Sequence, residues 1–219
     1  MFRILFHAIG RFFFTIVFGV SPVKQVKDEQ CIIVANHNTH IDILMLFRLF
    51  PLSRVNRVKV VAAKDYFSKG LVGVLSRLFL NLILVDRSSR KVDEALNPLR
   101  QAIQEGYSII IFPEGTRGKP GVLERFKTGV GILAMEFPEI PVYPVFIRGI
   151  EKIMPRGRFV PIPFNISISR TTPEYGKDYL SEQGSVGRKK LAAALEEKVL
   201  GLSKLLDDPD QNDESEEML

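Results

Sequence analysis

The feature that most restricts the fold is a series of short apolar runs that alternate with helical patterns. The runs are rich in β-branched residues, which is typical of strands buried on both faces of a sheet. They occupy residues 31–35, 58–63, 82–85, 107–112, 142–147 and 166–170. Patterns typical of helices lie between and after them, at residues 43–51, 66–80, 88–106 and 187–206. This alternation predicts an α/β fold with a single mixed, largely parallel sheet flanked by helices.

Length and composition support one compact domain. The chain has 219 residues, of which 46% are hydrophobic and 25% charged, and this composition excludes a wholly disordered chain. The single cysteine, Cys31, lies in the first apolar run and is predicted to be a buried thiol. One cysteine forms no internal disulfide, which fits a reducing compartment.

Charge is distributed unevenly along the chain. The formal net charge is +5, but residues 205–219 carry only acidic charge, so we interpret them as a disordered acidic tail. The remaining body is strongly basic, which suits a phosphate-bearing partner or an anionic membrane surface. Nucleic acid is not the expected partner, because the basic residues are scattered and form no basic helix or zinc-finger spacing.

Residues 1–21 form the most apolar segment. Its most apolar part, residues 4–20, would reach only about 25 Å as a helix, short of the ~30 Å hydrocarbon core, and it carries Arg11 in the middle. Arg3, His7, Arg11 and Thr15 recur at every fourth position and give the helix a polar stripe. We therefore expect an amphipathic helix that lies in the membrane interface, with the two arginines attracted to anionic headgroups. A cleaved signal peptide and a purely structural core helix are the alternatives.

Two polar clusters, at residues 36–42 and 112–117, directly follow predicted strands and should meet at one edge of the sheet. In the first cluster, His37 and Asp42 are placed to form a general base and its carboxylate partner. No G-x-S-x-G motif is present, and Cys31 lies inside a predicted strand, so a protein nucleophile is not evident. The pair then suits direct acyl transfer, in which a substrate hydroxyl attacks a thioester.

Four ordered blocks carry a resemblance to a known family. They are NHNTHID (36–42), LVDRSSR (84–90), FPEGTRG (112–118) and PVYPV (141–145). Together they resemble the glycerolipid acyltransferases, the 1-acylglycerol-3-phosphate acyltransferases and their relatives. The resemblance covers residues 31–148, and FKTG (126–129) belongs to it.

The resemblance implies an O-acyltransferase of phospholipid biosynthesis. Its implied reaction moves a fatty acyl group from acyl-CoA or acyl carrier protein to the free hydroxyl of a lysophospholipid. The favoured acceptor is 1-acylglycerol 3-phosphate, which gives phosphatidic acid. His37 would be the base and Asp42 its partner, without a covalent intermediate, a metal or a prosthetic group. The expected domains are the interface helix (1–21), the acyltransferase domain (22–204) and the acidic tail (205–219). The protein is expected to bind monotopically to the cytoplasmic face of a membrane.

The same resemblance suggests substrate-binding residues. A guanidinium holds phosphate through two hydrogen bonds, and a glycine permits a tight turn beside a ligand. The glutamate of the third block would bind a glycerol hydroxyl or brace the loop, or with the following threonine it would form only a helix-start turn. The candidates are Lys64, Arg87, Glu114, Gly115, Thr116, Arg117 and Lys127.

Several alternatives stay open at this point. Another lysolipid is the first alternative acceptor, and a membrane-bound lipid or thioester hydrolase would use the same histidine. A lipid-binding module without catalysis is weakened by the His37–Asp42 pair. His40 would allow a metal site only with a further carboxylate. Residues 129–134 match G-x-G-x-x-A, but they do not follow a strand, so we reject a dinucleotide site.

Overall fold

The computed structural model of the chain describes residues 2–39, 41–64, 70–86, 92–115, 123–150, 166–182 and 184–207. Within these ranges one six-stranded sheet has the order β3-β2-β4-β1-β5-β6. All neighbouring strands are parallel except β5 and β6, so the expected mixed, largely parallel sheet is confirmed. The strands are β1 (Ile32–Ala35), β2 (Val58–Ala63), β3 (Leu82–Val85), β4 (Ser108–Ile111), β5 (Val142–Arg148) and β6 (Ser167–Arg170).

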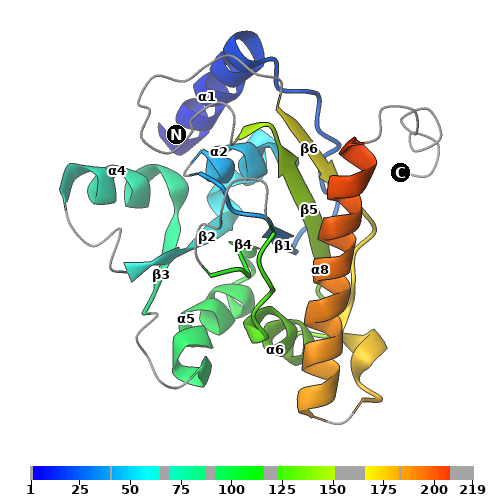
Figure 1. Cartoon of the computed structure of the whole chain (residues 1–219). Coiled ribbons are helices and arrows are strands. Elements are labelled where there is room, and N and C mark those ends of the chain that lie inside the picture. Colours follow the sequence, from blue (N-terminus) through cyan, green and yellow to red (C-terminus); the bar gives the residue numbers. More distant parts are fainter. Residues whose placement is uncertain are drawn as a thin grey trace.

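Helices cover the sheet (Figure 1). They are α1 (Phe2–Phe18), α2 (Asp42–Leu46), α4 (Gly70–Leu80), α5 (Val92–Gln104), α6 (Gly129–Glu136) and α8 (Ser185–Asp207). The helix expected over 43–51 is only partly α-helical, because η1 (Phe47–Leu49) continues α2 as a 3-10 turn, and η2 (Leu52–Arg57) follows. A further 3-10 turn, η3 (Gly176–Tyr179), precedes α8.

Part of the segment interpreted as the acidic tail belongs to the last helix, as the helical pattern over 187–206 also indicates. Residues 205–207 complete α8, and residues 208–219 lie outside the described part of the chain. The buried stripe Leu191, Leu195, Val199 and Leu202 packs the helix against the domain, whereas Leu205 in its last turn is 44% exposed.

Two hydrophobic layers hold the sheet. On one face, β-strand residues such as Ile33 and Val145 pack with Met45 and Phe47 of the α2–η1 segment. On the other face, alternate strand residues such as Ile32 pack against α5, α6 and α8. All four residues of β1 and of β4 are buried, which explains why the sequence of each strand is a continuous apolar run.

Asn36 ends β1 and directs the chain out of the sheet. Its side-chain amide donates to the carbonyl of Ile147 (2.9 Å) and accepts from the N–H of the same residue (2.8 Å). The Asn36 side chain therefore takes the place of main-chain groups in the last pair of hydrogen bonds between this end of β1 and β5. The main chain of residue 37 is free to leave the sheet, and this places His37 at the sheet edge.

The orientation of α1 corrects one expectation. Its polar stripe faces the protein and not a headgroup layer. Arg3 donates two hydrogen bonds to the carbonyl of Leu78 in the last turn of α4 (3.1 and 3.0 Å), and Arg11 donates to the carbonyl of Phe47 (2.7 Å). Carbonyls at the C-terminal ends of helices carry partial negative charge, so cationic side chains stabilise them.

The apolar side of α1 is consequently turned outward. Figure 1 shows this helix at the opposite end of the molecule from α5 and α6. Phe12 and Ile16 are 72% and 69% exposed. Ile4, on the inner side of the helix, packs instead against the core. None of the helices in the described ranges is long and apolar enough to cross a membrane.

Candidate active site

The parallel pairing of β1 with β4 brings the two predicted clusters together. Ile33 and Val34 lie opposite Ile110 and Ile111, so both strands end at the same edge of the sheet. The ring of His37 then stacks on the ring of Phe112, with centroids 4.0 Å apart and planes inclined by 21°. The expectation that the clusters meet at one edge is therefore confirmed.

His37 and Asp42 form a direct pair. Nδ1 of the histidine lies 2.9 Å from Oδ2 of the aspartate. Because a carboxylate only accepts, Nδ1 donates and Nε2 is left as the basic nitrogen of the ring. The His37 side chain is 13% exposed, whereas that of Asp42 is 1% exposed, so the pair reaches solvent through the imidazole.

Four donors fix the Asp42 carboxylate. Besides the imidazole, its Oδ2 accepts from the backbone N–H groups of Asn38 (2.6 Å) and Thr39 (2.8 Å). Its Oδ1 accepts from the hydroxyl of Thr39 (3.0 Å), which in turn accepts from the N–H of Ile41 (3.2 Å). Asp42 is the first residue of α2, so this network fixes the turn that leads into the helix.

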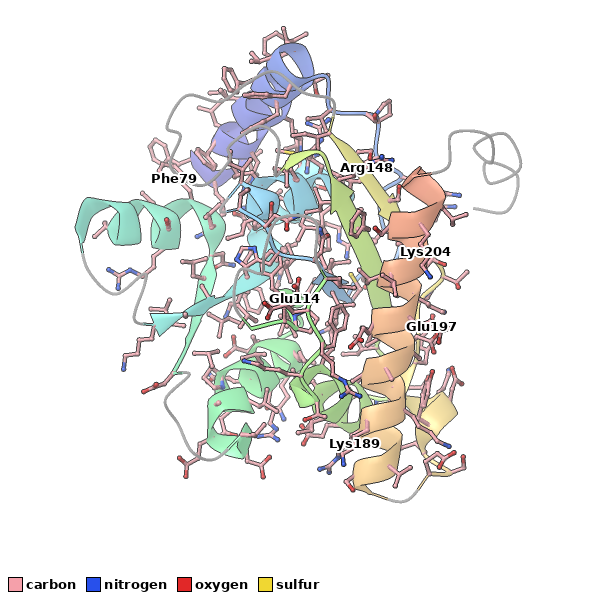
Figure 2. All side chains as sticks on the ribbon, viewed as in Figure 1. Phe79, Glu114, Arg148, Lys189, Glu197 and Lys204 are labelled. Carbon is pink, nitrogen blue, oxygen red and sulfur yellow. The ribbon has the colours of Figure 1, made fainter. Side chains whose placement is uncertain are left out.

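Glu114, which Figure 2 shows near the middle of the molecule, ties the two clusters together. Its Oε1 accepts from the N–H of His37 at 2.8 Å, and its Oε2 accepts from the N–H of Glu124 at 3.0 Å. Burial raises the pKa of the Glu114 carboxyl, and the two backbone hydrogen bonds partly offset that effect. Of the roles considered for this residue, the structure shows the brace between loops.

Lys127 and Gly115 are also neighbours. Gly115 has a φ of +78°, and a Cβ on it would lie 2.8 Å from Cε of Lys127. The lysine side chain therefore runs directly over the turn, and the positive φ is the reason that this position favours glycine. The backbone N–H of Lys127 donates to the carbonyl of Pro113 (2.9 Å), so the main chain is held beside the turn as well.

Of the other predicted site residues, the described ranges include Lys64. Lys64 is exposed and follows β2, which lies on the far side of β4 from β1, so it is separated from the histidine. Arg87, Thr116 and Arg117 lie outside the described residues, as does His40, the alternative metal ligand.

Some site residues were not predicted. Thr39 is one, although the spacing Thr39-x-x-Asp42 is that of a reciprocal helix cap and would have indicated it. Phe112 and Glu124 are others, and their roles depend on contacts between distant segments that no local pattern shows.

Comparison with known proteins decides the family. A family model described as Acyltransferase matches residues 18–148, which span both polar clusters and the Gly115–Lys127 contact. The chain belongs to this acyltransferase family. The predicted resemblance to glycerolipid acyltransferases is thereby confirmed.

Relatives of this acyltransferase agree with that assignment. The chloroplastic 1-acyl-sn-glycerol-3-phosphate acyltransferase of Brassica napus is 30% identical over 68% of this chain and 42% of its own length. The human 1-acyl-sn-glycerol-3-phosphate acyltransferase beta is 28% identical over 62% of this chain and 48% of its own. The chain spans about half the length of such relatives.

A solved structure supports the fold. The 1-acyl-sn-glycerophosphate acyltransferase of Thermotoga maritima superposes with a TM-score of 0.66 at 26% identity. The match covers 91% of this acyltransferase and 79% of that chain. The agreement extends beyond the residues of the family model and includes most of the described helices and strands.

Proposed function

We propose that this acyltransferase moves a fatty acyl group from a thioester to the free hydroxyl of 1-acylglycerol 3-phosphate, which gives phosphatidic acid. The observation that carries the proposal is the His37–Asp42 contact, because it leaves Nε2 as a base at the carboxyl edge of the sheet. The names of the relatives support the acceptor.

The chemistry requires only one base. Nε2 of His37 takes the proton of the acceptor hydroxyl as that oxygen forms a bond to the thioester carbonyl carbon. The carbon–sulfur bond then breaks, and the proton on Nε2 passes to the leaving thiolate. Asp42 holds the ring in the required tautomer and stabilises the imidazolium. The donor is acyl-CoA or acyl carrier protein, and no metal or prosthetic group takes part in the proposed step.

A covalent route through the cysteine is physically disfavoured. Cys31 immediately precedes β1, whereas His37 follows the other end of that strand. Its side chain is fully buried, and burial raises the pKa of the thiol to about 12. A thiol in this state supplies almost no thiolate near neutral pH.

Phosphate recognition is assigned to the basic residues of the second and third blocks, Arg87 and Arg117, together with Lys127 of FKTG and Lys64. Lys127 supports this, since its side chain crosses the glycine turn next to the brace formed by Glu114. Arg117 and Arg87 complete the proposed set as bidentate phosphate donors. Lys64 is the weakest member, given its exposed position after β2.

We also propose monotopic binding to the cytoplasmic face of a membrane. The support is the outward apolar side of α1, whose exposed side chains would be removed from water at an interface. Each large apolar side chain buried in this way contributes roughly 1.5–3 kcal/mol. The lysophospholipid acceptor of the proposed reaction resides at such a surface.

The decisive assay supplies labelled acyl-CoA or acyl carrier protein with a panel of lysolipids. Labelled phosphatidic acid from 1-acylglycerol 3-phosphate is the expected product. Preference for a different lysolipid would reassign the acceptor. Release of free fatty acid at the same rate without any lysolipid would identify a hydrolase, and an acyl group trapped on the protein would contradict direct transfer.

A further inference from the structure

One segment next to the site is held by a residue that no motif includes. Residues 123–127, which we name the strap, have no regular secondary structure and lead to α6. Glu196 of α8 reaches this strap: its Oε2 accepts a hydrogen bond from the backbone N–H of Phe126 at 2.7 Å. The carboxylate comes from a helix distant in sequence and acts on main chain, not on a partner side chain.

The strap is fixed at three successive points. Glu114 holds the N–H of Glu124, Glu196 holds the N–H of Phe126, and the carbonyl of Pro113 accepts from the next residue. The Phe126 side chain is buried in the core layer that contains Leu195 and Val199 of α8. The strap is therefore anchored to α8 by a buried ring and by a charge-assisted hydrogen bond.

The residue that directly follows this anchor is Lys127. Its side chain runs over Gly115, one residue after the backbone N–H that Glu196 holds. A hydrogen bond to a charged group is stronger than one between neutral groups, so Glu196 is well suited to hold the main chain at that point.

We infer that Glu196 is a positioning residue, which acts through the strap to set Lys127 for the phosphate of the acceptor. The inference rests on the proposed function. It extends the substrate site to α8, which lies outside the matched family region of residues 18–148.

The chain offers a matched control. Glu197 is the next residue on α8 and carries the same charge, but its side chain is exposed and lies on the outer side of the helix (Figure 2). Glu197→Gln therefore removes the same formal charge without touching the strap.

The test compares steady-state kinetics of the full chain with 1-acylglycerol 3-phosphate. We expect Glu196→Ala to raise the Michaelis constant for this acceptor about tenfold, with kcat within about twofold of wild type. Glu196→Gln keeps an acceptor oxygen and should restore most of the loss, and Glu197→Gln should match wild type. If Glu196→Ala does not fold, Glu196→Asp, whose carboxylate is one methylene shorter, replaces it with the same expected direction.

A double-mutant cycle separates positioning from general stability. If Glu196 acts through Lys127, adding Lys127→Ala to Glu196→Ala should raise the Michaelis constant little further. Additive effects, or an unchanged constant in Glu196→Ala, would overturn the inference. A wild-type chain that makes no phosphatidic acid would instead overturn the proposed function, so the two failures are distinguishable.

Discussion

The carboxylate of Glu114 lies 2.8 Å from the backbone nitrogen of His37, so a residue that follows β4 holds the main chain of the proposed catalytic base. This contact joins the two polar clusters by a hydrogen bond and not by proximity alone. The other carboxylate oxygen holds the strap, so a single buried side chain aligns the base with the loop that carries Lys127.

Replacing Glu114 by glutamine should lower stability and turnover together. An amide has one accepting oxygen, so its NH₂ group would face either the His37 N–H or the Glu124 N–H. Leaving such a buried donor unsatisfied costs about 1–3 kcal/mol. We expect Glu114→Gln to lower the free energy of unfolding by that amount and to reduce kcat. The measurements are denaturant unfolding and steady-state kinetics, with Glu197→Gln as control.

The Michaelis constant for the acceptor distinguishes two roles of Glu114, which either braces the loops or binds the glycerol hydroxyl. A brace moves the base, so the loss should fall mainly on kcat. A raised Michaelis constant for the acceptor with unchanged kcat and stability would show that the carboxylate binds the glycerol hydroxyl instead.

Arg117→Lys should weaken binding of a phosphate-bearing acceptor. A planar guanidinium holds two phosphate oxygens, whereas an ammonium offers a point charge. We expect the Michaelis constant for 1-acylglycerol 3-phosphate to rise about tenfold. A raised constant for the thioester donor, with an unchanged one for the acceptor, would assign this residue to the coenzyme.

Because His7 of α1 is buried, we expect the free energy of unfolding of the protein to depend on pH. Burial is the main cause that lowers its folded-state pKa to about 4, from 6.5 in the unfolded chain, and its Nε2 donates to the carbonyl of Phe79. The unfolded state therefore binds a proton first as pH falls. The free energy of unfolding therefore keeps its full value above pH 6.5. As the pH falls from 6.5 to 4, it decreases by up to about 3 kcal/mol.

The corresponding measurement is the free energy of unfolding between pH 7.5 and 4 for wild type and for His7→Gln. Glutamine also donates to a carbonyl but does not titrate, so the wild-type curve should fall more steeply below pH 6.5. Parallel curves would show that His7 is not the group responsible.

The outward side of α1 can be tested without removing the helix. Deleting residues 1–20 would leave the carbonyls of Leu78 and Phe47 without their arginine donors. The double variant Phe12→Ser, Ile16→Ser changes only exposed positions. We expect flotation with anionic liposomes to fall at least tenfold.

Leu180→Ser provides the control for that experiment, because this exposed leucine lies after η3 and not on α1. It should float as wild type does. Equal flotation of the α1 double variant and wild type would show that membrane binding depends on another surface.

The sequence predicted the strands well because their burial on both faces leaves continuous β-branched runs. It did not predict α6, since this helix is buried on several sides and has no polar stripe. Its Gly131 belongs to the rejected dinucleotide pattern, yet a Cβ there would collide with the carbonyl group of Arg188 on α8. The glycine is thus required by close helix packing.

The sequence predicted the His37–Asp42 pair, but it did not predict the hydrogen bonds that hold the surrounding loops. His37 and Asp42 are five residues apart, so their contact is local. The bonds from Glu114 to the strap and from Glu196 to Phe126 join segments whose approach depends on the whole fold. The direction of the polar stripe of α1 was predicted wrongly for a similar reason, because the carbonyls that attract it belong to α4 and η1.

The most direct test of the central claim is the rate of phosphatidic acid formation by His37→Ala, at saturating thioester and 1-acylglycerol 3-phosphate. Loss of a general base should lower kcat by about 100-fold or more, while binding of the thioester persists. A variant that folds and retains kcat within a few-fold of wild type would contradict the assignment of His37 as the base that activates the acceptor hydroxyl.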